Sequence, residues 1–264
     1  MKKITLLSVL ISSVILFTSC DDNTPPSPPA GVNVFNGDSR VDISWNRNRE
    51  SDVAGYNVYW NYIYEGKYTL LGSTSDTYFI DNEAVNANKY YYAVAAYDYD
   101  GNESELSYDE VYAAPRPEDF NQVIYDAQQF PNNSGFTFID FTVVPFDNDL
   151  TDFYFDIFEG VPYLNVWRVP SPTLIQDMGN TTDIYDISYA PNTGWTDAEY
   201  LRAYVGHTYV IWTYDNYFGK IRIKSIASDR VIFDWAFQEI KGERLLKPVK
   251  REGERNPDRL KLAR

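Results

Sequence analysis

The strongest constraint on the fold is a series of short segments rich in β-branched and aromatic residues and separated by turn residues. Asn36 and Gly37, between the first two segments, favour a tight turn. In the second segment Val41, Ile43 and Trp45 alternate with polar residues and so share one face. The segments lie at 32–35, 40–45, 55–60, 68–71, 77–80, 90–97 and 106–113. Short strands at such regular spacing predict a β-sandwich.

Residues 52–60 (DVAGYNVYW) and 86–107 (NANKYYYAVAAYDYDGNESELS) make the prediction more specific. With them, the chain from about residue 30 to 115 resembles a fibronectin type III domain, which is an immunoglobulin-like sandwich. The resemblance places Trp45 at the core tryptophan of that family and Tyr90 at its tyrosine corner. Both are structural positions. The Arg-Gly-Asp triplet is absent from the sequence, so the resemblance does not imply integrin binding.

One turn of this domain is rich in side-chain oxygens. Asp98, Asp100 and Asn102 surround Gly101 with the spacing of part of a calcium loop. No glutamate closes a twelve-residue loop, so we interpret the segment as an Asx-rich turn between strands, and we predict no metal site.

A second β-rich domain is expected over residues 119–240, after the proline-marked boundary APRPED at 114–119. Asp215 with Asn216, and Ser228 with Asp229, favour hairpins near its end. The strand candidates are 136–144, 153–158, 163–169, 183–189, 200–205, 208–213, 219–226 and 230–237. The predicted fold class is therefore all-β, with a fibronectin type III sandwich followed by a second antiparallel β-rich domain.

Residues 1–19 have the pattern of a secretory signal peptide, with basic residues at 2–3, an apolar stretch and small residues before the single cysteine, Cys20. Residues 17–20 (FTSC) resemble the lipobox of bacterial lipoproteins of a Bacteroidota-like kind, although Phe17 replaces the commoner Leu. The resemblance implies that Cys20 carries acyl chains that anchor the protein to a membrane. A lone cysteine in a secreted chain can form no internal disulfide, which agrees with this role. A buried first helix is the alternative reading.

The resemblance implies a location in the cell envelope, on the outer membrane. Asp21 and Asp22 follow the cysteine and resemble an export signal in some lipoproteins and a retention signal in others, so a periplasmic and a surface-exposed location both stay open. Residues 20–29 also contain four prolines, which predict an extended and stiff linker.

Charge excludes one class of partner. The formal net charge is −15, from 38 acidic and 23 basic residues, which argues against nucleic acid. Residues 241–264 differ from the rest, with nine Lys or Arg against four Asp or Glu, a net of +5. We interpret this basic segment as a flexible or partly helical tail, with a partner-docking arm as the alternative.

The sequence does not favour catalysis. One histidine, an acylated cysteine and no Gly-x-Ser-x-Gly, phosphate-loop or zinc motif exclude the common nucleophilic and metal mechanisms. Paired carboxylates of a glycosidase stay open, because acidic residues lie close together at Asp140, Asp147, Asp149, Asp152, Asp156 and Glu159. We predict a protein that is not an enzyme, with no catalytic residue and no cofactor.

Three binding functions are compatible with these observations. The favoured one is a non-catalytic, lipid-anchored envelope protein whose fibronectin type III module presents a binding domain to a protein or a surface polymer. The second is carbohydrate binding through exposed aromatic residues, because sugar rings stack on aromatic faces. Its candidates are Trp167, Trp195 and Tyr217, together with Tyr163 and Tyr214.

The third function is haem or metal carriage at His207. Residues 206–238 resemble the C-terminal β-meander of haem-scavenging lipoproteins of Bacteroidota. Those proteins hold haem iron between two histidines, whereas this chain has a single one, so the pair does not carry over. We therefore favour a hydrogen-bonded residue at a strand edge for His207.

Overall fold

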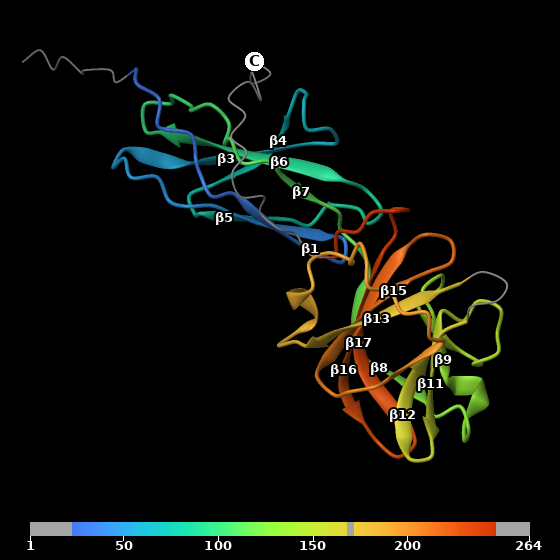
Figure 1. Cartoon of the computed structure of the whole chain (residues 1–264). Coiled ribbons are helices and arrows are strands. Elements are labelled where there is room, and N and C mark those ends of the chain that lie inside the picture. The colour runs from blue at the N-terminus through green and yellow to red at the C-terminus, as the bar shows by residue number, and fades with distance from the viewer. Residues whose placement is uncertain (1–22, 168–171, 247–264) are drawn as a thin grey trace, which may run out of the picture.

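The computed structural model describes residues 23–167 and 172–246, in which the regular elements are β-strands apart from two short 3₁₀ turns. They form two domains that follow one another along the chain (Figure 1). This confirms the predicted fold class. The described part of the chain contains no helix long and apolar enough to cross a membrane. Cys20, the signal-like segment and residues 247–264 lie outside the described residues.

The first domain is a sandwich of two antiparallel sheets. Its three-stranded sheet has the order β1 (Asn33–Gly37), β2 (Arg40–Ser44), β5 (Tyr78–Asp81). Its four-stranded sheet has the order β4 (Thr69–Thr74), β3 (Val53–Asn61), β6 (Tyr90–Asp98), β7 (Val111–Ala113). The inward positions of both sheets form one apolar core, as their alternation predicts.

The positions that the fibronectin resemblance assigned are confirmed. Trp45 is buried in the core and meets the ring of Tyr56 edge-on, with ring centroids 5.3 Å apart. The hydroxyl of Tyr90 accepts a hydrogen bond from the backbone N–H of Val85 at 3.0 Å, which is the tyrosine corner. The Asx turn is also confirmed, because the Asp98 carboxylate accepts the N–H groups of two residues of its own turn.

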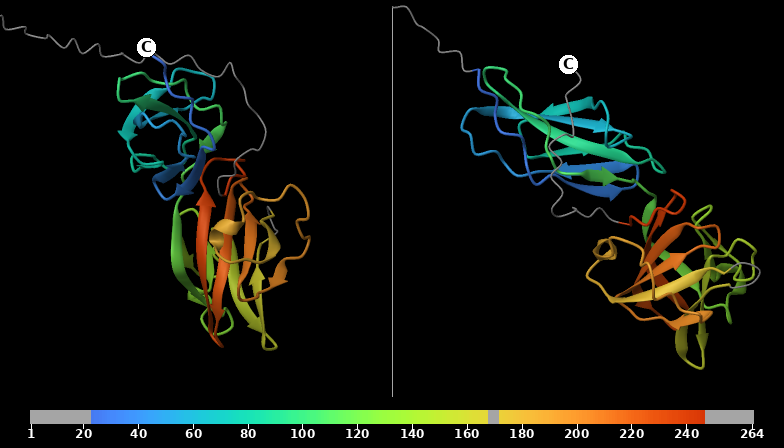
Figure 2. Two further views of the ribbon diagram at one scale, coloured as in Figure 1. Left: turned by 90° about the vertical axis from the view of Figure 1, so that its left-hand side faces the viewer. Right: turned by 45° about the horizontal axis from the view of Figure 1, so that its top comes forward.

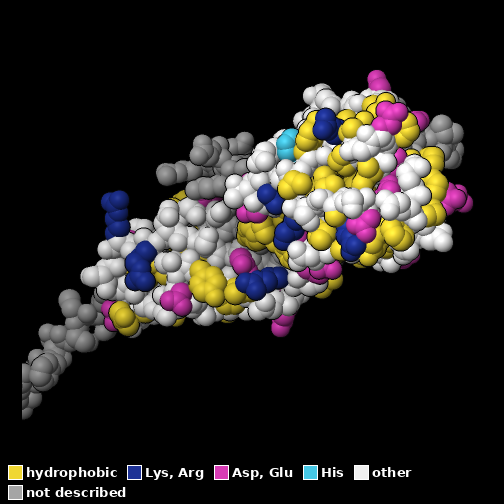
Figure 3. Space-filling model, turned by 90° about the horizontal axis from the view of Figure 1, so that it is seen from below, with side chains coloured by type: hydrophobic (Ala, Val, Ile, Leu, Met, Phe, Trp, Pro, Cys, Tyr) yellow, Lys and Arg dark blue, Asp and Glu magenta, His cyan; other side chains and the backbone are white. Residues whose placement is uncertain are grey.

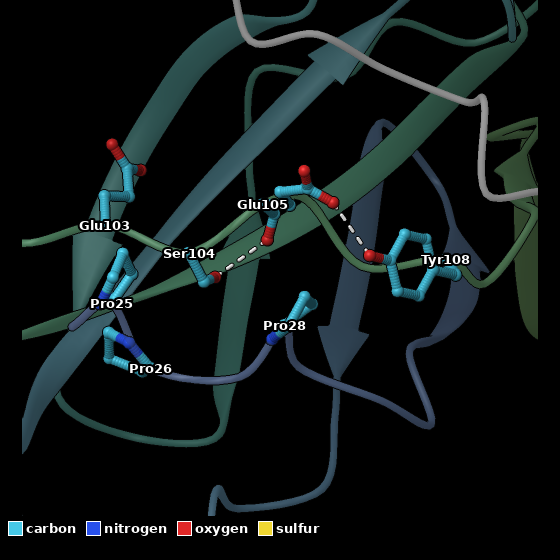
Figure 4. Close-up of a pocket in the computed structure, with 7 residues that line it drawn as sticks. All are labelled: Pro25, Pro26, Pro28, Glu103, Ser104, Glu105 and Tyr108. Atoms are coloured by element: carbon cyan, nitrogen blue, oxygen red, sulfur yellow. Dashed lines mark hydrogen bonds between the residues drawn. The ribbon is translucent and has the colours of Figure 1, made fainter.

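The proline-rich segment differs from the extended linker expected of it. Pro26 and Pro29 are buried against the first domain, and the N–H of Ser27 donates to the Glu50 carboxylate at 2.9 Å. The hydrogen bonds from Ser27 lower the pKa of Glu50 to about 2. Figure 4 shows three of the prolines facing Glu103, Ser104, Glu105 and Tyr108 across a concavity of about 350 Å³. From Pro25 onward the segment therefore belongs to the packed domain.

The second domain consists of two five-stranded antiparallel sheets. One sheet has the order β10 (Thr142–Val144), β9 (Gly135–Thr137), β11 (Phe153–Phe158), β12 (Val161–Asn165), β14 (Tyr200–Arg202). The other has the order β13 (Leu174–Asn180), β15 (His207–Trp212), β16 (Phe218–Ile226), β17 (Arg230–Gln238), β8 (Glu118–Tyr125). An aromatic core lies between them, with Phe136 in contact with the rings of Phe153, Phe233 and Trp235. Both predicted hairpins are confirmed, as β15–β16 and β16–β17.

Two predicted strands of this domain were wrong. Residues 136–144 form a hairpin of β9 and β10 rather than one strand, and Phe141 in the turn has a positive φ of 53°. Residues 183–189 contain a 3₁₀ turn, η2 (Ile184–Asp186), because Asp183 and Asp186 form a capping box around it. A second 3₁₀ turn, η1 (Pro131–Asn133), precedes β9. Strands β8 and β13 were not predicted.

The outer face of the sheet that contains β15 is covered by the chain itself. Ala190, Val210, Phe218 and Leu246 form a small apolar cluster there. The basic segment expected to be a flexible tail thus begins as packed structure, because Leu245 and Leu246 are both buried. The described chain is thus packed against the domain as far as Leu246, its last described residue.

The two domains meet at a buried joint, visible between β1 and the second domain in Figures 1 and 2. Residues 114–117 connect β7 to β8 and are all buried. Arg116 is fully buried, and its Nη1 donates to the carbonyl oxygen of Asn36 at 3.3 Å. Its Nη2 lies 3.6 Å from Oε2 of Glu118. The Tyr185 hydroxyl donates to Glu118 at 2.6 Å, and its ring contacts Phe35 of the first domain at 4.7 Å.

An ion pair at the edge of the joint also connects the two domains. The ammonium group of Lys89, in the first domain, lies 2.6 Å from the carboxylate of Glu243, in the second. The side chain of Gln238 also donates to the carbonyl oxygen of Ala114 in the connection. Side chains of both domains therefore fix the connection, which is not a free linker.

Candidate functional site

The outward face of the sheet β10-β9-β11-β12-β14 carries the most distinctive surface of the second domain. In an antiparallel strand alternate side chains point to opposite faces. Phe153 and Phe155 of β11 and Leu164 of β12 enter the core. The residues between them therefore point outward, and we call six of them the outer strip: Tyr154 and Asp156 on β11, Tyr163 and Asn165 on β12, and Tyr200 and Arg202 on β14.

Strand register arranges the outer strip in two rows. Tyr154 pairs with Asn165, which pairs with Tyr200 on the next strand. Asp156 pairs with Tyr163, which pairs with Arg202. Neighbouring strands lie about 4.8 Å apart, and every second residue of a strand about 7 Å apart. Aromatic and hydrogen-bonding side chains therefore alternate over the strip in both directions.

Contacts between side chains order the strip. The amide of Asn165 donates to Asp156 at 2.9 Å, which holds the two polar groups at its centre. The rings of Tyr163 and Tyr200 meet edge-on with centroids 5.4 Å apart. Tyr200 is 57% exposed, so its ring is open to a ligand.

Trp167 lies at one end of the strip. Its ring centroid is 5.5 Å from that of Tyr154, and its Nε1 donates to the carbonyl oxygen of Phe146 at 3.0 Å. The side chain is nevertheless 39% exposed. The indole is thus held in place by its polar edge while part of its face stays open.

Tyr204 and His207 extend the strip at its other end. The guanidinium of Arg202 lies over the ring of Tyr204, 5.2 Å from the centroid, and the Tyr204 ring lies 4.9 Å from that of His207. Nδ1 of His207 is 3.0 Å from both carboxylate oxygens of Asp177. His207 therefore has the polar partner we predicted. It occupies the first position of β15, a strand inside its sheet, and is not on an edge strand.

The charges of the strip are mixed. Burial raises the pKa of Tyr154, and the negative charges of Asp156 and Glu199 raise it further. This keeps the Tyr154 hydroxyl protonated, so that it can donate as well as accept a hydrogen bond. Arg202 supplies a positive charge on the opposite side of the strip. In Figure 3, hydrophobic side chains gather over the second domain with acidic and basic side chains among them.

The structure does not bring all the predicted ligand residues together. Trp195 packs on Trp212 and Phe218, in the apolar cluster on the outside of the other sheet. Tyr217 packs on Phe237 at the border of the aromatic core. Of the predicted residues, only Trp167, Tyr163 and His207 belong to the strip or its ends.

Two carboxylates of the acidic run have different surroundings. Asp156 lies on the outer strip, whereas Asp152 is buried and accepts the N–H of Phe138 at 2.7 Å. Burial, together with the nearby charge of Asp215, raises the pKa of Asp152 to about 7. Over residues 23–167 and 172–246, no three His, Cys, Asp or Glu side chains cluster in a way that could hold a metal ion.

Comparison with known proteins gives partial matches. No family model matches the chain. Amylopullulanase from Thermoanaerobacterium saccharolyticum is 38% identical over 112 residues, which is 41% of this chain and 8% of that protein. Amylopullulanase from Thermoanaerobacterium thermosulfurigenes is 41% identical over 92 residues, which is 34% of this chain and 5% of that protein. The chain therefore spans less than a tenth of these relatives.

Some solved structures match about a third of the chain, and others match most of it. An Fn3-like protein from Clostridium thermocellum is 25% identical with a TM-score of 0.28, over 32% of this chain and 88% of that one. A DUF4466 family protein from Parabacteroides merdae is 10% identical with a TM-score of 0.40, over 82% of this chain and 96% of that one. The chain is an all-β protein with a fibronectin type III-like domain.

Proposed function

We propose that this protein is a non-catalytic binding protein whose second domain holds a polysaccharide on the outer strip. The observation that carries the proposal is the alternation of tyrosines with Asp156, Asn165 and Arg202 on one sheet face. The apolar faces of sugar rings stack on aromatic rings, while their hydroxyls need hydrogen-bond donors and acceptors nearby. The strip supplies both within reach of one another.

The same alternation favours a polysaccharide over a protein partner. Protein-binding surfaces have a contiguous apolar centre with a polar rim. Here Asn165 and Asp156 occupy the centre and are hydrogen-bonded to each other. Asn165 is buried, and a protein that covered the partly exposed Asp156 with apolar side chains would remove its water without replacing the hydrogen bonds, at a cost of about 1–3 kcal/mol for an unsatisfied group.

The relatives support an accessory role. The matches to amylopullulanase cover 8% and 5% of those proteins, which is the size of a module attached to a larger enzyme. A fibronectin type III-like domain joined to a second sandwich suits a part that binds. Amylose and pullulan, which the name of these relatives denotes, are thus the first polysaccharides to test.

We further propose that Cys20 is acylated, so that the protein is anchored in the cell envelope. The motivation is the signal-like segment that ends at the single cysteine. Incorporation of labelled palmitate into the intact protein, and its loss in Cys20→Ser, tests this proposal. Palmitate labelling that persists in Cys20→Ser, or that is absent from the intact protein, would contradict it.

Binding to a panel of soluble polysaccharides, including amylose and pullulan, tests the main proposal. We expect affinity electrophoresis to show retardation by at least one of them. The double variant Trp167→Ala/Tyr200→Ala should weaken binding at least tenfold, because two stacking surfaces are lost. Tyr99→Ala is the matched control, since this tyrosine is 79% exposed on the first domain.

The Tyr99→Ala control should bind as the intact protein does, and both variants should keep the circular dichroism of the folded chain. If the double variant binds as tightly as the control, or if no polysaccharide in the panel is retained, the proposed function is wrong.

A further inference from the structure

We infer that the ligand is an internal stretch of an extended polysaccharide, several sugar units long, and not a monosaccharide or a chain end. The inference rests on the proposed function and specifies its ligand. Three features of the outer strip carry it: its length, the exposure of both ends, and its position on the outward face of a sheet.

The length follows from strand geometry. Trp167 is four residues beyond Tyr163 along the direction of β12, which is about 13 Å for extended chain. β11 and β14 lie on either side of β12, so the strip is two strand spacings, or about 10 Å, wide. Tyr204 continues two residues beyond Arg202 in the opposite direction from Trp167. The diagonal from Trp167 to Tyr204 is therefore roughly 20 Å, which is longer than a single sugar ring.

Both ends of this diagonal are open. The side chain of Trp167 is 39% exposed and that of Tyr204 is 42% exposed. Among the described residues these two side chains are both open to solvent, so we expect a chain that lies along the strip to continue past them.

The position of the strip on an outward sheet face determines how affinity arises. Sites for small ligands are concave and bury most of the ligand surface. A sheet face covers only one side of each sugar unit, so each unit gains little on its own. Contacts at Trp167, at the Tyr163–Tyr200 pair and at Tyr204 act on one ligand only when the chain spans them.

The experiment uses the intact protein and a length series of oligosaccharides from the polysaccharide retained best in the panel. In calorimetric titrations we expect no measurable binding of the monosaccharide. Affinity should rise at least tenfold with length and stop rising once the oligosaccharide spans the roughly 20 Å diagonal. Chemical reduction of the chain end should leave the affinity of the long oligosaccharides unchanged.

Variants at the two ends give an independent test. Trp167→Ala and Tyr204→Ala should each weaken binding of the long oligosaccharide by about threefold to tenfold. The shortest oligosaccharide that binds should lose affinity in only one of them, because it reaches only one end. Tyr99→Ala serves again as the control and should change neither.

Failure here is distinguishable from failure of the proposed function. A monosaccharide that binds as tightly as the polymer, or affinity that disappears when the chain end is reduced, would overturn the inference while polysaccharide binding stands. Retention of no saccharide at all would overturn both.

Discussion

Arg116→Ala should lower the free energy of unfolding by about 3–5 kcal/mol, because it leaves a buried carboxylate without its cation. Arg116 is fully buried, and the carboxylate of Glu118 lies 3.6 Å from its guanidinium. Burial lowers the pKa of Arg116, and the charge of Glu118 acts in the opposite direction. The substitution also removes the hydrogen bond to the Asn36 carbonyl across the joint. Urea denaturation followed by tryptophan fluorescence measures the loss.

Two further variants separate charge from packing. Arg40→Ala breaks the exposed pair with Asp42, whose side chains are 46% and 39% exposed, and should cost at most about 1 kcal/mol. The double variant Arg116→Met/Glu118→Leu removes both buried charges and should recover most of the stability. If Arg116→Ala costs no more than Arg40→Ala, the buried pair does not stabilise the joint.

Asp152→Asn should stabilise the protein at pH 8. The unfolding free energy of the variant minus that of the intact chain should be roughly 2–4 kcal/mol larger at pH 8 than at pH 4. Burial raises the pKa of Asp152 to about 7, aided by the charge of Asp215. The group is therefore protonated in the folded protein over a range where it is ionised in the unfolded chain. Its contribution to stability is complete below pH 4 and is lost as the pH rises through about 7.

The measurement is the difference in unfolding free energy between variant and intact protein, taken from pH 4 to pH 8. Asparagine keeps an acceptor for the N–H of Phe138 but cannot ionise, so the difference should grow with pH. Asp140→Asn, at an exposed position of the same acidic run, is the control. A difference that stays constant over this range would show that Asp152 does not titrate as described.

The first domain could be predicted from sequence almost strand by strand. Its strands are short, burial alternates along β1 and β2, and Trp45 and Tyr90 occupy the positions that the fibronectin type III sandwich assigns to them. In this domain the local sequence pattern and the tertiary structure agree, and for that reason the strands could be predicted. The packing of the proline-rich segment could not be predicted, since it depends on Glu50 and Asn48 more than twenty residues away.

In the second domain the errors have local causes. Strand β8 reads as polar, with the sequence EDFNQVIY, and only pairing with β17 makes it a strand. Strand β13, LIQDMGN, is interrupted by a bulge between Asp177 and Asn180, so its alternation is broken. The stretch 183–189 looked alternating, yet the capping aspartates favour a turn.

The candidate site was the least predictable part. Trp167, Tyr163 and His207 were singled out by residue type, but Tyr154, Asn165, Tyr200 and Arg202 were not. These four lie on three strands from different parts of the chain, and only the register of β11, β12 and β14 makes them neighbours. The available signal was the polar or aromatic residue at every second position of each strand, which marks the outward face without revealing which strands adjoin.

The buried connection between the domains also determines how the molecule presents its ligand. With Ala114 and Arg116 buried and Lys89 paired with Glu243, the second domain has little freedom to swivel about the first. A support attached to the chain near residue 25 would therefore hold the sheet that carries the outer strip in one orientation. Many copies attached to such a support would present their rows of aromatic rings in that same orientation.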